Sequence, residues 1–137
     1  NQPHPTTIYA SKFSIQFCAA LALLKGSASP HDFNEENLFD DQIRKLMDKV
    51  EVSIEPSIEA DYPNQWGAEV HLYLEDGTYF QKRTNAPKGD PENPVSKEML
   101  IDKFRKLTSS LSAEKTEQFI DQVMKIDQHG SVKHLWN

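Results

Sequence analysis

The most prominent hydrophobic pattern in the chain is the segment KFSIQFCAALALLK at residues 12–25. It contains no proline or glycine and is followed by Gly26, a residue that often comes directly after the last turn of a helix. The sequence therefore predicts a helix over residues 12–25. Its apolar residues cover all sides of that helix, which is typical of a buried helix. We expect it to be enclosed by the rest of the chain or by a segment outside this chain.

Helical spacing recurs at three later places. An i, i+3, i+4, i+7 pattern predicts a helix over residues 36–49. Ser96 and Ser112 are favourable N-cap residues, and each precedes a further amphipathic segment. The apolar residues of the three inward faces are Ile43, Leu46, Met47 and Val50, then Leu100, Phe104 and Leu107, and finally Phe119, Ile120, Val123 and Met124.

Alternation of apolar and polar residues predicts strands in the middle of the chain. Residues 50–54 alternate in this way and predict a short, half-buried strand. Residues 67–75 and 78–84 flank Asp76-Gly77, a dipeptide that favours a two-residue type I′ turn. The sequence therefore predicts an antiparallel hairpin closed by that turn.

The order of these elements predicts the fold class. Strands that lie between pairs of helices are typical of an α+β fold, in which helices pack on one face of a small antiparallel sheet. We expect an extended lead-in with few anchoring contacts over residues 1–10, one domain over residues 11–126 and a tail over residues 127–137. The proline-rich segment NAPKGDPENP predicts an irregular surface connection before the last two helices.

Composition suggests that the chain is part of something larger. Its 137 residues suffice for one compact domain, but only 37% of them are hydrophobic, which is low for an ordinary domain. We therefore expect a segment outside this chain to supply part of the core. The sequence also opens at Asn1 and lacks an initiating methionine, which favours a piece of a longer chain.

Charge and cysteine content exclude several functions. A net charge of −6 gives no broad basic surface, so we expect neither nucleic acid nor a membrane as a partner. The longest apolar run, residues 17–24, is too short to cross a bilayer. Cys18 is the single cysteine, which excludes an internal disulfide and favours a reducing environment. We expect a soluble, cytoplasmic protein.

The residues themselves reveal no evident active site. The histidines show no metal-ligand spacing, and no nucleophile elbow or phosphate-binding glycine loop is present, so we expect no metal and no cofactor. Cys18 lies in an apolar helix, where a thiol usually acts as a small hydrophobic group. The basic residues near the hairpin either hold a substrate carboxylate or cover a strand edge. The histidines are His4, His31, His71, His129 and His134, and the basic residues are Lys82, Arg83 and Lys88.

Three segments resemble a known family. Residues 12–26, KFSIQFCAALALLKG, are similar to its polar, aromatic, Ser and Ala/Leu-rich helix, which is closed by Gly. Residues 87–107, PKGDPENPVSKEMLIDKFRKL, are similar to its Pro-x-Gly-Asp-Pro-x-x-Pro-Leu-Ser segment and the following Lys-Phe-Arg helix. The hairpin segment LEDGTYF lies in register between them. Together these segments resemble the MmgE/PrpD family over most of residues 11–126.

The resemblance implies a fold and an activity. MmgE/PrpD proteins are two-domain enzymes, in which a large helical domain carries most of the active site and a smaller α+β lid domain closes over it. Their activities include 2-methylcitrate dehydration, cis-aconitate decarboxylation and iminodisuccinate epimerisation, all on small polycarboxylates. This chain resembles the later part of the lid. The implied partners are a polycarboxylate substrate, the absent helical domain and a second copy in a homodimer.

Three residues are candidate substrate contacts by resemblance. Some family members have a tyrosine, with its hydroxyl facing the active-site cleft, where this chain has Phe17. Phe17 cannot donate a hydrogen bond, which argues against decarboxylation and leaves dehydration or epimerisation open. Ser14 and Gln16 are the polar residues next to it. They either contact substrate or make only local bonds at the start of the helix. The catalytic residues are expected outside this chain.

Two functional hypotheses follow. In the first, the chain is the C-terminal portion of a lyase or isomerase that acts next to a carboxylate, and it is inactive alone. In the second, it is a non-catalytic module that binds a protein through its apolar first helix.

Overall fold

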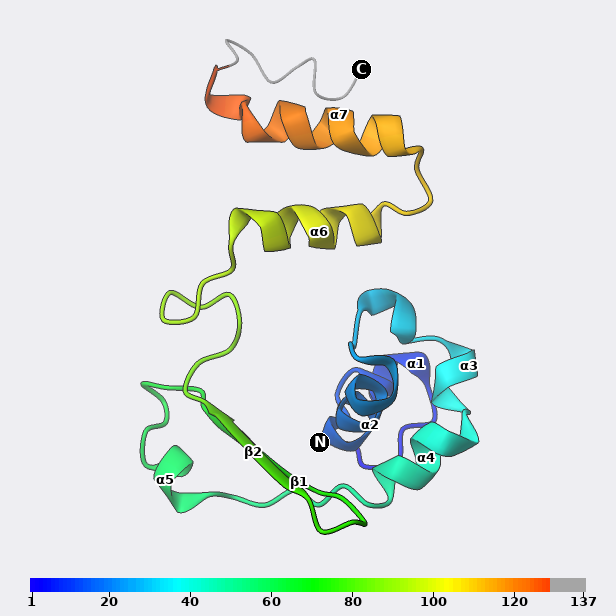
Figure 1. Ribbon diagram of the computed structural model, residues 1–137, viewed down its shortest axis with the longest axis vertical. Coiled ribbons are helices and arrows are strands. Elements are labelled where there is room, and N and C mark those ends of the chain that lie inside the picture. Colours follow the sequence, from blue (N-terminus) through cyan, green and yellow to red (C-terminus); the bar gives the residue numbers. More distant parts are fainter. Residues whose placement is uncertain (129–137) are drawn as a thin grey trace. The chain divides into compact units, whose positions relative to one another are not determined.

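The computed structural model describes residues 1–128 and divides the chain into two compact units, residues 1–85 and 86–137 (Figure 1). The α+β class is confirmed, because the described residues form helices and one antiparallel strand pair. The first unit contains α1 (Ile8–Ser11), α2 (Ile15–Lys25), the 3₁₀ turn η1 (Pro30–Asp32), α3 (Glu35–Leu38), α4 (Asp41–Met47), α5 (Pro56–Glu59), β1 (Ala68–Tyr73) and β2 (Tyr79–Thr84). The second contains α6 (Lys97–Leu107), α7 (Ala113–Met124) and η2 (Ile126–Gln128).

The core of the first unit lies where α2 packs against α4. The Phe17 ring meets the ring of Phe33, with 5.9 Å between their centroids. Full burial of side chains of this size contributes roughly 1.5–3 kcal/mol each, so this small cluster is the main source of stability in the unit. The buried apolar residues are Phe17, Ala20, Leu21, Leu38, Ile43 and Met47.

Helix α2 begins three residues later than predicted. Ser14 has an extended backbone, and its hydroxyl oxygen accepts a hydrogen bond from the N–H of Phe17 at 3.1 Å. A serine N-cap of this kind fixes the first turn, which leaves Lys12 and Phe13 in the turn before the helix. The predicted end is confirmed, because Gly26 is left-handed with φ 75° and its N–H donates to the carbonyl of Ala22.

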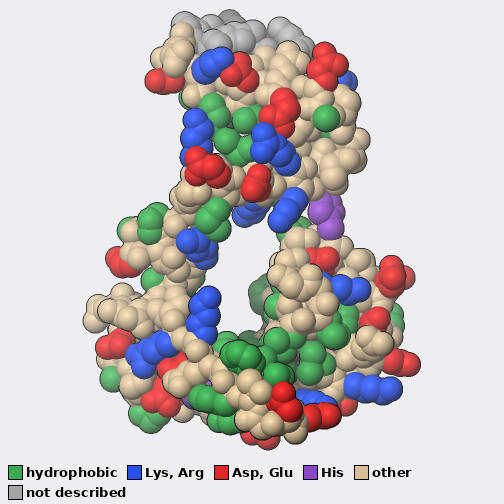
Figure 2. Space-filling model, in the orientation of Figure 1, with side chains coloured by type: hydrophobic (Ala, Val, Ile, Leu, Met, Phe, Trp, Pro, Cys, Tyr) green, Lys and Arg blue, Asp and Glu red, His purple; other side chains and the backbone are tan. Residues whose placement is uncertain are grey.

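The described residues of the first unit do not enclose α2. One side lies in the core, whereas Phe13, Ile15, Leu23 and Leu24 on its outer side and just before it are about half exposed. Hydrophobic side chains reach the surface of both units in Figure 2. The rest of the first unit therefore does not enclose this helix, and cover by a segment outside this chain stays a prediction.

The predicted helix over residues 36–49 is divided into α3 and α4. The break falls at Phe39 and Asp40, where the Asp40 carboxylate accepts hydrogen bonds from the N–H groups of Gln42 at 2.8 Å and Ile43 at 3.0 Å. Asp40 thus caps a new helix inside an otherwise continuous apolar pattern.

The predicted strand over residues 50–54 is wrong. No strand is formed there, and Ile54 is 78% exposed. Residues 50–54 alternate between apolar and polar side chains, but no described strand lies beside them. Their backbone N–H and C=O groups therefore have no strand to pair with, and the segment is irregular. The lead-in also differs from expectation, because it is anchored: Pro5 is fully buried, and its carbonyl accepts a hydrogen bond from the Arg44 guanidinium at 3.2 Å.

The hairpin is confirmed, with β1 and β2 in the register Ala68↔Thr84 to Tyr73↔Tyr79. Its turn differs from the prediction. The N–H of Gly77 donates to the carbonyl of Leu74, and Gly77 is left-handed with φ 85°, whereas no other residue type has a positive φ in the described chain. This is the pattern of a type I turn followed by a glycine bulge, and it excludes type I′. All six residues of β2 are exposed, so the helices of the first unit give the sheet little cover.

The second unit consists of two amphipathic helices. As predicted, Ser96 and Ser112 cap α6 and α7 by accepting hydrogen bonds from the N–H groups of Met99 and Lys115. Between the helices, the Arg105 guanidinium donates two hydrogen bonds to the carboxylate of Glu117, at 2.7 and 2.9 Å. These contacts link two helices that, with the connection between them, expose many apolar residues: Met99, Leu100, Leu107, Leu111, Val123 and Met124.

Candidate functional site

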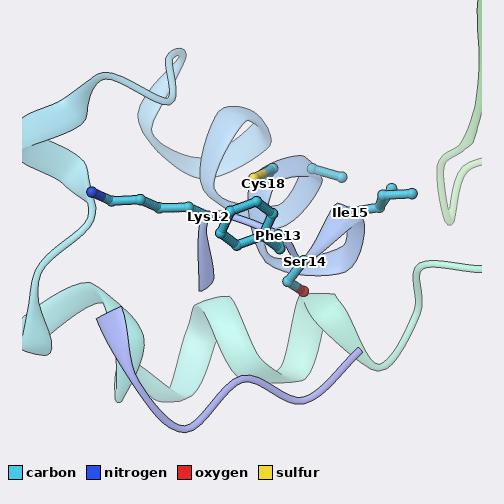
Figure 3. A pocket seen from close by; sticks show the side chains of 6 residues that line it. Lys12, Phe13, Ser14, Ile15 and Cys18 are labelled. Carbon is cyan, nitrogen blue, oxygen red and sulfur yellow. The ribbon is translucent and has the colours of Figure 1, made fainter. Parts of the chain in front are cut away.

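A hollow of about 440 Å³ lies where the turn after α1 leads into α2 (Figure 3). The turn is fixed by hydrogen bonds from the N–H of Phe13 to the carbonyl of Ala10 and from the N–H of Ser14 to that of Ser11. The hollow is open and mainly apolar. Of the three residues suggested by resemblance, Ser14 contributes to its lining, whereas Gln16 and Phe17 do not. The lining residues are Lys12, Phe13, Ser14, Ile15, Cys18 and Ala19.

Ser14 is buried and occupied by the helix cap. Its hydroxyl oxygen accepts the hydrogen bond from Phe17, and Figure 3 shows the hydroxyl directed away from the Phe13 ring. A capping oxygen satisfies one of the backbone N–H groups that every helix leaves without a partner at its start. The structure therefore gives Ser14 the local role that the sequence left open.

Gln16 is 8% exposed and makes a specific contact with the first residue. Its side-chain oxygen accepts a hydrogen bond from the Asn1 amide at 3.0 Å, and the Asn1 oxygen accepts one from the N–H of Ile15 at 3.0 Å. Within residues 1–128, the Gln16 amide nitrogen has no acceptor, so it retains two donors.

Phe17 is fully buried and belongs to the apolar core. It packs against Phe33, and it brings no polar group to the start of α2. Its position in the structure is that of a core residue.

Sequence reasoning did not select Lys12 and Cys18, which also line the hollow. Lys12 is exposed and has no acidic partner among the described residues. The Cys18 sulfur lies 3.8 Å from the carbonyl oxygen of Ser11, and burial raises the pKa of its thiol, which keeps it protonated. The overlooked signal was the position of Lys12 two residues before the serine cap. This lining can bind an anionic group, but it holds no acid and base pair.

The basic residues near the hairpin do not form an anion site of their own. The Arg83 guanidinium donates a hydrogen bond to the Ser57 hydroxyl at 2.8 Å, and it lies 3.7 Å from the carboxylate of Asp61 and 3.9 Å from that of Glu69. Lys88 donates to Asn93 at 3.4 Å. The alternative in which these residues cover a strand edge fits the contacts of Arg83, which lies on β2. His129 and His134 lie outside the described residues.

The described residues contain neither a cluster of metal-binding side chains nor a helix suited to a membrane. Between residues 1 and 128, no group of three or more His, Cys, Asp or Glu side chains is arranged to hold a metal ion. No helix in the same range has both the length and the apolar character needed to cross a membrane.

Comparison with known proteins gives a consistent result. Residues 1–128 match the model of the MmgE/PrpD C-terminal domain. The chain is 30% identical over 128 residues to cis-aconitate decarboxylase of Mus musculus and 29% identical over 125 residues to cis-aconitate decarboxylase of Homo sapiens. These alignments cover 93% and 91% of this chain, but 26% of each relative.

The chain therefore spans about a quarter of the length of the curated relatives that it matches. The family match covers every described residue, including the α2 helix, the hairpin and the segment before α6 on which the resemblance was based. This chain belongs to the MmgE/PrpD family and corresponds to its C-terminal domain.

Proposed function

We propose that this chain is the C-terminal portion of a lyase or isomerase that acts on a small polycarboxylate and that it has no activity alone. The observation that carries this proposal is the match of residues 1–128 to the family's C-terminal domain, together with the 26% coverage of cis-aconitate decarboxylases. A reaction next to a carboxylate needs a positioned base, a proton donor and groups that stabilise negative charge. The hollow at α2 offers no such set, so the catalytic groups belong to the absent helical domain.

The residues at the start of α2 support an anionic substrate. Lys12 places an ammonium group at the hollow, and the Gln16 amide retains two donors. Charge-assisted hydrogen bonds to a carboxylate are stronger than neutral ones. We propose that Lys12 and Gln16 approach a substrate carboxylate when the helical domain is present, and that Ser14 and Phe17 shape this region by capping and packing.

For the reaction, we propose dehydration or epimerisation. Phe17 carries no hydroxyl, and its ring packs in the core against Phe33. A proton donor at this position, which the resemblance implies for some family members, is thus absent from this chain.

An activity assay tests the proposal. The protein that joins this chain to its helical domain would be incubated with cis-aconitate, 2-methylcitrate and iminodisuccinate, and each mixture followed by NMR for loss of carbon dioxide, loss of water or inversion. We expect conversion of a polycarboxylate by the joined protein and none by the 137-residue chain. Conversion by the isolated chain, or of none of the three compounds by the joined protein, would contradict the proposal.

A pair of matched variants tests the substrate contact. Lys12→Met removes the ammonium group at the hollow, just before α2, whereas Lys25→Met removes one from the last turn of α2. Loss of one charge-assisted hydrogen bond corresponds to roughly a tenfold rise in KM. We expect that rise for Lys12→Met and little change for Lys25→Met. If both variants raised KM equally, Lys12 would act only through the overall charge of the protein and not through a direct contact with the substrate.

The second candidate function is a non-catalytic module that binds a protein through α2. The observation in its favour is the half-exposed apolar group Phe13, Ile15, Leu23 and Leu24. The reading frame upstream of Asn1 separates the two candidates. A helical domain of a few hundred residues supports the enzyme, and an immediate start codon supports the module.

We also propose that the complete protein is a cytoplasmic homodimer. Exposed apolar surface at α2 supports association, because large patches of this kind usually mark interaction sites. Size-exclusion chromatography with light scattering measures the mass of the protein in solution and so separates a monomer from a dimer. A monomer that binds no hydrophobic dye would contradict this part of the proposal.

A further inference from the structure

Asn1 contacts the start of α2 through both ends of its side-chain amide. Its oxygen Oδ1 accepts a hydrogen bond from the N–H of Ile15 at 3.0 Å, and its nitrogen Nδ2 donates one to Gln16 Oε1 at 3.0 Å. The two partners are 14 and 15 residues away in the sequence. Asn1 therefore makes two specific tertiary contacts at the place where α2 begins.

The backbone fixes the orientation of both amides. A backbone N–H can only donate, so Asn1 must turn its oxygen toward Ile15. The NH₂ group of Asn1 then faces Gln16 and can only donate, so Gln16 must turn its own oxygen toward Asn1. The free end of the Gln16 amide is therefore its NH₂ group, which offers donors and no acceptor.

This free end belongs to a side chain that is almost fully removed from water. Gln16 is 8% exposed, and its NH₂ group has no acceptor within residues 1–128. A buried donor that lacks a partner costs more than an average hydrogen bond contributes, and nearly all such groups in native proteins are satisfied. The two donors of Gln16 therefore require an acceptor from outside the described residues.

The residues that follow Asn1 hold it in place. The N–H of Gln2 donates to the carbonyl of Phe13 at 3.2 Å, in the turn that leads into α2. Pro5 is fully buried, and its carbonyl accepts a hydrogen bond from the Arg44 guanidinium at 3.2 Å. The Asn1 amide thus lies on a segment with two further anchoring contacts.

We propose that Asn1 is a positioning residue, which orients the Gln16 amide so that its two donors meet a carboxylate of the substrate. The inference rests on the proposed function, in which Gln16 approaches a substrate carboxylate once the helical domain is present. An ionised carboxylate only accepts hydrogen bonds, so the orientation set by Asn1 is the one complementary to it. The reversed amide would place its oxygen against the carboxylate, and two acceptors repel each other.

Asn1→Asp reverses this arrangement, because it replaces the NH₂ group of Asn1 with an oxygen of similar size. One aspartate oxygen still accepts from the N–H of Ile15, and the other can only accept, so Gln16 has to turn its NH₂ group toward residue 1. A negative charge beside the first turn of a helix is favourable. We therefore expect the variant to fold at least as well as the unmodified chain.

NMR of the glutamine side-chain amides in the 137-residue chain reports the orientation. In Asn1→Asp we expect the NH₂ signals of Gln16 to move downfield and to exchange more slowly with water, because they gain a carboxylate acceptor. Asn64→Asp adds the same charge at an exposed residue and should leave these signals unchanged. Unchanged Gln16 signals in Asn1→Asp would overturn the proposal.

Kinetics of the joined protein test the effect on substrate, with the polycarboxylate that this protein converts. Loss of one hydrogen bond to a charged group corresponds to a rise in KM of roughly tenfold or more. We expect this rise for Asn1→Asp with kcat unchanged, because the contact holds the substrate equally in the ground state and the transition state. Asn64→Asp should leave both constants unchanged.

Two kinetic results would contradict the positioning role. An unchanged KM in an Asn1→Asp protein whose Gln16 amide has reversed would overturn it. A loss of stability of the joined protein at constant KM would overturn it as well, because the acceptor for Gln16 would then belong to the helical domain. Failure of the proposed function is distinct from both, since the unmodified joined protein would then convert none of the three polycarboxylates.

Discussion

The contact between α2 and α4 and the hairpin of β1 and β2 are held together in opposite ways. The helices bury a small set of apolar side chains, among them Leu21 and Ile43, which are fully inaccessible to water. The hairpin buries almost nothing, and hydrogen bonds between polar side chains join its strands on one face. The two regions therefore depend on different forces.

This difference has consequences for how each region responds to conditions. Apolar burial depends little on pH or salt, whereas exposed ionic and polar contacts respond to both. A two-stranded hairpin is also marginally stable without a packed face. The contact between α2 and α4 can persist by itself, and the hairpin is the region whose stability most depends on further cover.

The largest expected effect comes from removing a core side chain. Leu21→Ala creates a cavity between α2 and α4, and we expect the free energy of unfolding to fall by about 2–5 kcal/mol. Leu24→Ala makes the same change one turn further along α2, at a residue that is 43% exposed, and should cost about 0.5 kcal/mol or less. Urea unfolding followed by circular dichroism measures both. Equal losses would mean that the outer side of α2 is covered after all.

The next effect concerns the hairpin turn. Gly77 has φ 85°, and a Cβ atom there would meet nothing within 4 Å, so Gly77→Ala costs only the strain of a left-handed backbone, about 1–2 kcal/mol. Asn tolerates this conformation better, and Gly77→Asn should cost less. Cross-strand NMR contacts report hairpin formation. We expect Gly77→Ala to weaken them while the helical signals of α2 remain. Loss of both together would show that the two regions unfold as one.

A smaller effect separates the two roles considered for Ser14. Because its hydroxyl caps α2, Ser14→Ala should lower stability by about 1 kcal/mol, whereas Ser14→Gly should cost only a few tenths. Thermal unfolding of the isolated chain, with no substrate present, gives the comparison. If neither variant changes stability, the cap is unimportant and a direct role in substrate binding becomes the better interpretation.

Features fixed by short stretches of sequence were predicted well. Ser96 and Ser112 cap their helices as expected, and Gly26 ends α2, because a cap depends on residues within one turn. The hairpin strands were also found, since alternation and a turn signal lie close together. Asp40 was missed as a cap because the apolar pattern continues across it, even though its side chain has the chemistry that a cap requires.

Features that depend on distant partners were predicted poorly. Alternation over residues 50–54 indicates a strand only if another strand lies beside it, and none does in the described residues. The hydrogen bond between His71 and Tyr79 depends on the register of two strands, so the sequence suggested no more than an exposed histidine. Glu69 and His71 do share one face of the predicted hairpin with Tyr79 and Gln81, and this was the available signal. Lys12 was overlooked because the helix was predicted to begin with it.

The smallest expected effect concerns the response of the start of α4 to pH. Hydrogen bonds from the N–H groups of Ile43 and then Gln42 lower the pKa of Asp40 below its ordinary value, with a minor contribution from Lys25. A carboxyl whose pKa is lower in the folded state stabilises that state above its unfolded pKa, and this contribution is lost as pH falls through the folded value. Acid should therefore weaken the start of α4.

Asp40→Asn isolates the effect of protonating Asp40 on α4, because asparagine caps a helix but does not titrate. Amide hydrogen exchange at Ile43 is the measurement, since its N–H donates to the Asp40 carboxylate at 3.0 Å. As pH falls below about 4, corrected for the intrinsic exchange rate, protection at Ile43 should decrease in the unmodified chain and stay level in Asp40→Asn. A parallel decrease in both proteins would mean that acid acts on α4 through other carboxylates, and the difference between the two regions would then lie in burial alone.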